Sequence, residues 1–139
     1  MSLRVLHVLD HSLPLHSGYS FRTLAILREQ RALGWQTEHL TTPKQGAGTV
    51  LQEEVDGWLF HRTPSTEGSG LLHQMRLTTT RLQEVVRATQ PDLIHAHSPV
   101  LNALPSLWVG RRQRLPVVYE MRASWEDAAV DHGTTKEGS

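Results

Sequence analysis

Hydrophobic runs separated by polar segments predict five strands along the chain. Apolar residues on both faces of 3–9 are typical of a buried strand in a parallel sheet. The segment 35–42 alternates hydrophobic and polar residues, which predicts a second strand. Similar short runs predict strands at 58–62, 92–98 and 115–122.

Two longer segments between these strands have the spacing of amphipathic helices. Apolar residues recur at helical spacing over 21–33, with Ser20 expected to cap the amino end and Gly34 the carboxyl end. The stripe over 71–90 is also helical, and Pro91 ends it.

The remaining segments predict a third helix and a loop. Ser98 followed by proline indicates a helix start, and the helix over 100–114 is expected to be interrupted at Pro105. Glycines and an Asp-Gly pair in 44–57 indicate a loop.

The order of these elements predicts an α/β fold. We expect a Rossmann-like parallel sheet with strand order 3-2-1-4-5, counted along the chain, and helices on both faces. The chain stops soon after a strand that should be internal. We therefore expect an incomplete sheet, a fragment of a longer protein, and self-association through an exposed strand edge.

Composition narrows the classes of function. The chain has 139 residues, 20% of them charged, and a formal net charge of zero, so no general attraction to nucleic acid is expected. It has no cysteine, which excludes disulfides and thiolate metal sites. No apolar run approaches the roughly 20 residues that span a bilayer, and no signal peptide is predicted. A cytoplasmic location is expected.

In open α/β sheets, ligands bind at the carboxyl ends of the strands, where the strand order reverses. The first strand leads there into "HSGYS" (16–20), directly before a helix. Such a loop can bind an anion through backbone N–H groups, and Gly18 would allow close approach. The alternative is an ordinary turn. The sequence contains neither GxGxxG nor GxxxxGK[ST], which argues against a dinucleotide fold and a P-loop.

Histidines mark the first and fourth strands. His95 and His97 lie on the same side of a strand and could bind a metal, but no third ligand is marked nearby. We expect no metal. His7 and His95 are expected to be buried core residues, whereas His97 and Ser98, at the strand end, are expected to face a ligand.

The fifth strand ends in further candidates. Glu120 and Arg122 should lie at its carboxyl end, where Arg122 could hold a phosphate or carboxylate. Trp125 could stack on a sugar or cover the edge of the core. The alternative for this segment is a solvated surface with local ion pairs.

Three blocks together resemble a known family: "RVLHVLDHSLPLHSGYSFRT" (4–23), "PDLIHAHSP" (91–99) and "PVVYEMRASWEDAAVDHGTT" (116–135). The chain resembles the amino-terminal half of family 4 glycosyltransferases of the GT-B type. Within that group it is most similar to the glycosyltransferases associated with bacterial exosortase and exopolysaccharide loci.

The resemblance implies two Rossmann-like domains that face a cleft. The amino-terminal domain holds the acceptor, and the other domain binds the nucleotide and carries an E-x7-E motif. A glycine-rich loop after the first strand closes on the donor diphosphate, and this implies that role for Ser17, Gly18 and Tyr19. Many relatives have a histidine just past strand five, near the transferred sugar. This sequence has Arg122 at about that place, so the role of the histidine is not carried over. Glu120 and Arg122 match the E-x-R pattern of the subgroup and are candidates for catalysis.

The resemblance also implies a function. We expect 1–123 to be a truncated acceptor-side domain and 124–139 a loop or disordered tail. The full-length enzyme would transfer a sugar, with retention and without a cofactor, from a nucleotide-sugar donor to a glycan or polyprenyl-linked acceptor.

The full-length enzyme would act in bacterial exopolysaccharide or cell-surface glycan synthesis and would associate peripherally with the inner face of the membrane. The fragment alone is expected to be inactive. The alternative is a non-catalytic flavodoxin-like module that binds a nucleotide or a protein.

Overall fold

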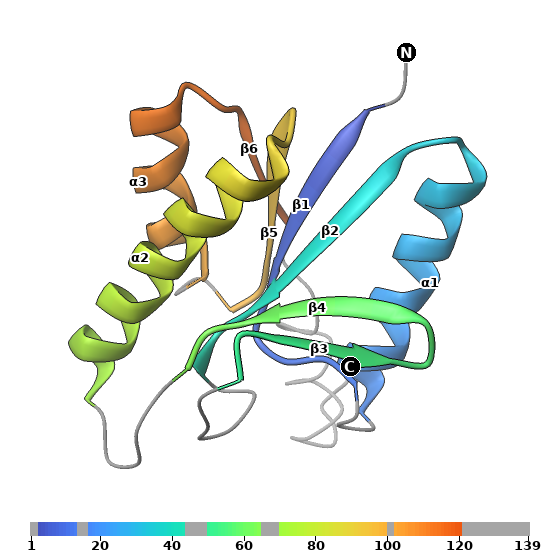
Figure 1. Ribbon diagram of the computed structural model, residues 1–139, viewed down its shortest axis with the longest axis horizontal. Coiled ribbons are helices and arrows are strands. Elements are labelled where there is room, and N and C mark those ends of the chain that lie inside the picture. The colour runs from blue at the N-terminus through green and yellow to red at the C-terminus, as the bar shows by residue number, and fades with distance from the viewer. Residues whose placement is uncertain (1–2, 14–16, 44–49, 65–69, 100–101, 121–139) are drawn as a thin grey trace, which may run out of the picture.

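A six-stranded sheet forms the middle layer of the molecule, with helices on both faces (Figure 1). The computed structural model describes residues 3–13, 17–43, 50–64, 70–99 and 102–120. Helix α1 covers one face of the sheet, and helices α2 and α3 cover the other (Figure 1). The predicted α/β architecture is therefore confirmed.

The sheet has the strand order β3-β4-β2-β1-β5-β6. All neighbouring strands are parallel except β3 and β4, which are antiparallel. The predicted order 3-2-1-4-5 corresponds to β4-β2-β1-β5-β6 and is confirmed for these five strands, but the sheet has a sixth strand, β3, at its edge. The strands are β1 (Arg4–Leu9), β2 (Gln36–Thr41), β3 (Gln52–Val55), β4 (Trp58–Arg62), β5 (Leu93–His97) and β6 (Val117–Glu120).

Strand β3 lies in a segment that was expected to be a loop, and this part of the prediction is wrong. Its residues are mostly polar and exposed, so they lack the apolar pattern of a buried strand. The strand forms because Asp56 and Gly57 both adopt positive φ angles, 52° and 82°. Such a two-residue turn matches the twist of a hairpin and pairs β3 with β4.

The first two helices agree with the predictions except at the amino end of α1. Helix α1 (Gly18–Ala32) is capped by Ser17, whose Oγ accepts a hydrogen bond from the N–H of Ser20. Ser20 is therefore inside the helix and is not its cap. Gly34 follows the helix with φ +89°, the left-handed conformation that favours glycine. Helix α2 (Leu71–Thr89) ends before Pro91 as predicted.

Helix α3 (Ala103–Gln113) starts later than predicted and is not interrupted. Pro105 is its third residue, where a backbone N–H would have no partner within the helix, so the proline is tolerated. Asn102 stands at the amino end, and its side-chain amide donates to the carbonyl oxygen of His97. This bond ties the start of α3 to the end of β5.

The core has one apolar cluster on each face of the sheet. The cluster under α2 and α3 contains Leu6, Val8, Leu40, Leu82, Val85, Val86, Ile94 and Val109. The cluster under α1 is smaller and contains Leu9, Leu13, Leu24, Leu27 and Phe60. Within the described part of the chain, no helix is long and apolar enough to cross a membrane.

Candidate functional site

The carboxyl ends of β1, β5 and β6 lie side by side, which brings the predicted site segments to one edge. Strand β1 pairs with β5, and β5 pairs with β6 with His97 opposite Glu120. The described residues place Ser17, Tyr19 and Ser98 at this edge as well. Arg122 and Trp125 lie outside the described residues.

Tyr19 connects the loop after β1 to the end of β5. Its hydroxyl donates to the carbonyl oxygen of Ser98 at 2.8 Å and accepts from the backbone N–H of Asp10 at 3.0 Å. Residues from β1, α1 and β5 are thereby held together. The Tyr19 side chain thus has a structural role at this edge of the sheet, and Ser98 contributes to the contact through its backbone carbonyl.

Gly18 is the first residue of α1 and is exposed. A Cβ added there would meet nothing within 4 Å, and its φ angle lies outside the left-handed region. The fold itself therefore does not require glycine at this position. The open space in front of it allows a ligand to approach the amino end of the helix.

Asp10 and His11 were missed by the sequence reasoning, although they stand beside Ser17. The Nδ1 of His11 lies 2.9 Å from the Oδ2 of Asp10, and its Nε2 lies 2.9 Å from the Oγ of Ser17. The imidazole also packs against the ring of Tyr19, with 4.6 Å between centroids. The signal in the sequence was an Asp-His pair directly after a strand, upstream of the serine that caps the next helix.

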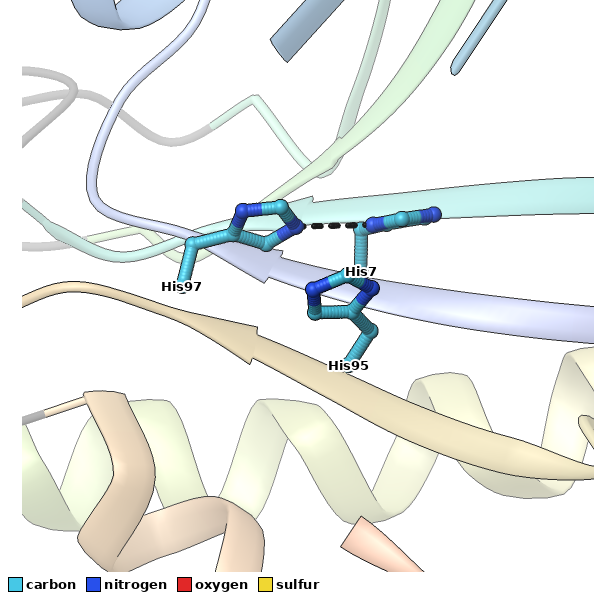
Figure 2. A group of neighbouring side chains, drawn as sticks. All are labelled: His7, His95 and His97. Carbon is cyan, nitrogen blue, oxygen red and sulfur yellow. Dashed lines mark hydrogen bonds between the residues drawn. The ribbon is translucent and has the colours of Figure 1, made fainter. Parts of the chain in front are cut away.

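Three histidines gather on the α1 face of the sheet, and Figure 2 shows how they lie. His7 comes from β1, and His95 and His97 come from β5. His7 is completely buried as predicted. His97 is completely buried too and forms a 2.8 Å hydrogen bond with His7. The expectation that His97 faces a ligand is therefore not met, because its side chain points under α1.

The histidines continue a chain of hydrogen bonds that begins on helix α1. The Oε1 of Gln30 accepts from the Nε2–H of His7 at 2.8 Å. The Nδ1 of a neutral His7 then accepts from the Nε2–H of His97. Buried polar groups need such partners, so this network explains how a histidine-rich layer fits inside the sheet.

The structure supplies the third histidine that a metal site would need, since nitrogen atoms of the three residues lie within 4.8 Å of one another. The geometry nevertheless favours hydrogen bonds. Two nitrogen ligands on a tetrahedral zinc ion are about 3.3 Å apart, farther than the 2.8 Å between His7 and His97. The rings of His95 and His97 also stack nearly parallel, at 8°, so their lone pairs do not converge.

Glu120 links this network to the open edge. Its Oε1 accepts from the Nε2–H of His95 at 2.8 Å and lies 4.0 Å from the Nδ1 of His97. One third of its side chain is exposed. His95 thus holds one carboxylate oxygen of Glu120 in place, while part of the side chain remains exposed to solvent.

A buried arginine supports the loop after β1 from the side. Arg62, at the end of β4, donates to the Oγ of Ser12 and to the carbonyl oxygen of Leu13. Burial lowers the pKa of Arg62, and its ion pair with Glu53 acts in the opposite direction. Nothing in the sequence marked Arg62 as a support, because the contact depends on how the loop folds back.

Comparison with solved structures gives the same fold at low sequence identity. MurG from Acinetobacter baumannii matches with a TM-score of 0.60 and 14% identity, over 93% of this chain and 39% of that chain. Sucrose-phosphate synthase from Thermosynechococcus elongatus matches with a TM-score of 0.58 and 13% identity, over 96% and 36%.

UDP-GlcNAc 2-epimerase from Neisseria meningitidis, solved with UDP-GlcNAc bound, matches with a TM-score of 0.58 and 13% identity, over 84% and 31%. This chain therefore spans about a third of the length of each of these proteins. No curated protein matches the chain in sequence.

The family model for the glycosyl transferase 4-like domain matches residues 17–138, which is most of the chain. The matched residues begin at the serine that caps α1 and include the ends of β5 and β6. The chain belongs to the glycosyl transferase 4-like domain family.

Proposed function

We propose that this chain is the acceptor-side domain of a retaining glycosyltransferase that uses a nucleotide-sugar donor. Residues 1–123 would form this domain, and 124–139 would form a loop or tail after it. The observation that carries the proposal is family membership combined with the loop after β1, the end of β5 and Glu120 at one edge of the sheet.

The amino end of α1 is the proposed contact for the donor diphosphate. A helix amino end carries partial positive charge and N–H groups without partners in the helix. Ser17, Gly18 and Tyr19 stand at this end, with open space in front of Gly18. Negative charge on the leaving diphosphate would be stabilised there during transfer.

Glu120 is the proposed contact for a hydroxyl group of the sugar or acceptor. Its inner oxygen bonds to His95, and the exposed part of the carboxylate can accept a further hydrogen bond. His97 would act indirectly, through its hydrogen bond to His7 in the buried layer beside Glu120. Arg122 would neutralise a phosphate or orient the sugar, and Trp125 would stack on a sugar ring.

A lipid-linked acceptor is favoured by an apolar surface near the same edge. The amino-terminal halves of α2 and α3 expose large hydrophobic side chains beside an open groove. Leu72 is 75% exposed and Trp108 47% exposed. Arg76 lines the groove, and the guanidinium of Arg112 lies over the ring of Trp108. Such a basic and apolar surface suits the inner face of an anionic membrane, with exopolysaccharide or surface-glycan synthesis as the setting.

Nucleotide recognition is proposed to lie on a second domain, so the test requires a protein that carries both domains. That protein would be incubated with radiolabelled UDP- and GDP-sugars and polyprenyl phosphate in vesicles. We expect label in the lipid fraction with at least one donor and none with residues 1–139 alone.

Calorimetry of the 139-residue chain with UDP and GDP distinguishes the proposed glycosyltransferase domain from the alternative, a non-catalytic nucleotide-binding module. Little or no binding is expected, because most nucleotide contacts would lie on the second domain. Nanomolar to micromolar binding by this chain alone would contradict the proposal and would favour a nucleotide-binding module.

A further inference from the structure

Three residues at the carboxyl end of β1 form a continuous line of hydrogen bonds. The Oδ2 of Asp10 lies 2.9 Å from the Nδ1 of His11, and the Nε2 of His11 lies 2.9 Å from the Oγ of Ser17. We propose that Asp10, His11 and Ser17 form a catalytic triad that makes the Ser17 hydroxyl a nucleophile toward acyl and phosphonyl electrophiles. This reaction differs from glycosyl transfer, although Ser17 also stands at the proposed diphosphate contact.

The direction of the hydrogen bonds follows from the chemistry of the groups. An ionised carboxylate only accepts, so the proton on His11 must be on Nδ1, where it faces Asp10. In the neutral imidazole, Nε2 then has a lone pair that can accept from the Ser17 hydroxyl at 2.9 Å, a shorter contact than the 3.3 Å to the Ser20 Oγ, which is the other acceptor for this proton. A nucleophile, a base and a residue that orients the base are therefore present in the order that acyl transfer requires.

The triad is held by contacts on several sides, which a nucleophile needs for a fixed geometry. The ring of Tyr19 packs against the imidazole of His11, and the Tyr19 hydroxyl accepts from the backbone N–H of Asp10. The hydroxyl of Thr42 donates to the backbone carbonyl of Asp10 at 3.0 Å. Asp10 is thus fixed from both α1 and the end of β2.

A small electrophile can reach this site. The side chains of Asp10 and His11 are 17% and 22% exposed, and Ser17 is half-buried beside the exposed Gly18. The N–H of Ser20 donates to the Ser17 Oγ at 3.1 Å, which fixes the position of this oxygen. Capping and nucleophilic attack are compatible, because the cap uses a lone pair and the triad uses the proton.

The reaction with an aryl ester is a two-step acyl transfer. The Ser17 Oγ attacks the carbonyl carbon and forms a new C–O bond, while its proton moves to the Nε2 of His11. The bond to the aryl oxygen breaks, and His11 returns the proton to the phenol. Water then attacks the acyl-serine, gives a proton to His11 and releases the acid, while His11 reprotonates Ser17.

A fluorophosphonate probe stops after the first step and therefore tests the proposal directly. A bond forms between the Ser17 Oγ and phosphorus, the P–F bond breaks, fluoride leaves, and the proton remains with His11. We expect one adduct per folded wild-type chain by intact mass, located on Ser17 by peptide mapping. A folded wild-type chain without an adduct, or with the adduct on another residue, would overturn the proposal.

Variants separate the triad from a merely structural serine. Ser17→Asn keeps a good helix cap but has no hydroxyl, so it should fold and show no adduct. His11→Gln and Asp10→Asn should each slow labelling on the order of 10²-fold or more. His73→Gln, at an exposed histidine on α2, is the matched control and should label at the wild-type rate. Equal rates in His11→Gln and His73→Gln would contradict the role of His11 as the base.

Discussion

The two faces of strand β1 show two different ways of filling a protein interior. Toward α2 and α3, the strand presents Leu6 and Val8, which belong to a wholly apolar cluster. Toward α1, it presents Leu9 and also His7, a buried histidine with hydrogen bonds to Gln30 and His97. Because successive side chains of a strand alternate between faces, a single strand serves both environments.

The apolar face of β1 mainly stabilises the fold, whereas the polar face also orients side chains near the candidate site. Burial of apolar surface contributes about 25 cal/mol per Å² to the stability of the folded state, whatever the relative orientation of the side chains. Buried polar groups stabilise only when their partners are in place, so they specify orientation. On the α1 face, the buried polar groups extend to Glu120 and lie beside the loop after β1. The other face contributes apolar packing to the core.

The largest expected effect comes from a cavity in the apolar face. Leu82 is fully buried in the cluster under α2 and α3. Leu82→Ala should lower the free energy of unfolding by roughly 2 to 5 kcal/mol, because both apolar burial and packing are lost. Urea denaturation measures this. Leu72→Ala, at an exposed position on the same helix, should cost less than about 0.5 kcal/mol. Equal costs would contradict the assignment of the core.

The next effect comes from acid acting on the polar face. Burial lowers the pKa of His39 from 6.5 to about 4, against a hydrogen bond to the Leu59 carbonyl that raises it. The unfolded chain therefore binds this proton at higher pH than the folded chain. The free energy of unfolding should fall as pH decreases from 6.5 toward 4, by about 3 kcal/mol in total for this group.

Denaturant titrations across this range of pH measure the effect. Burial also lowers the pKa of His61, which contributes in the same direction. His39→Gln should reduce the dependence on pH, since glutamine does not titrate. An unchanged dependence in this variant would show that other groups cause it.

A smaller effect is expected from the bond between His7 and Gln30. His7→Leu removes a hydrogen-bonding partner from both Gln30 and His97 and should cost about 2 kcal/mol. Gln30→Met should cost less in the His7→Leu background than it does alone, because it removes the polar group that His7→Leu left without its partner, so the double variant should cost less than the sum of the two single variants. Fully additive costs would indicate that the two residues are not coupled.

Much of the fold could be predicted because hydrophobic periodicity is a local signal. The parallel strands and the helices α1 and α2 followed from it, and the order of five strands followed from the usual order in open α/β sheets. Strand β3 did not, because it is polar and exposed, and only the Asp56-Gly57 turn indicated a hairpin. The start of α3 was misplaced because Ser98 and Pro99 look like a helix start but precede the true cap, Asn102.

The candidate site was predictable in position but less so in detail. Strand order was enough to bring the loop after β1 to the ends of β5 and β6. The contact of His7 with His95 and His97 depends on register, which pairs His7 with His95 and which strand order alone does not provide. The roles of Asp10, His11 and Arg62 depend on how a loop folds back, and residue spacing does not specify this.

The most direct test of the glycosyltransferase proposal compares two glycines at helix amino ends. Gly18 begins α1 at the proposed phosphate contact, and Gly70 caps α2; an added Cβ meets nothing within 4 Å at either position. Gly18→Val and Gly70→Val would be made in the protein that carries both domains, and sugar release from its nucleotide donor would be measured. We expect Gly18→Val to reduce turnover at least about tenfold by blocking the helix end, and Gly70→Val to leave it unchanged. Unchanged turnover in Gly18→Val would contradict the account.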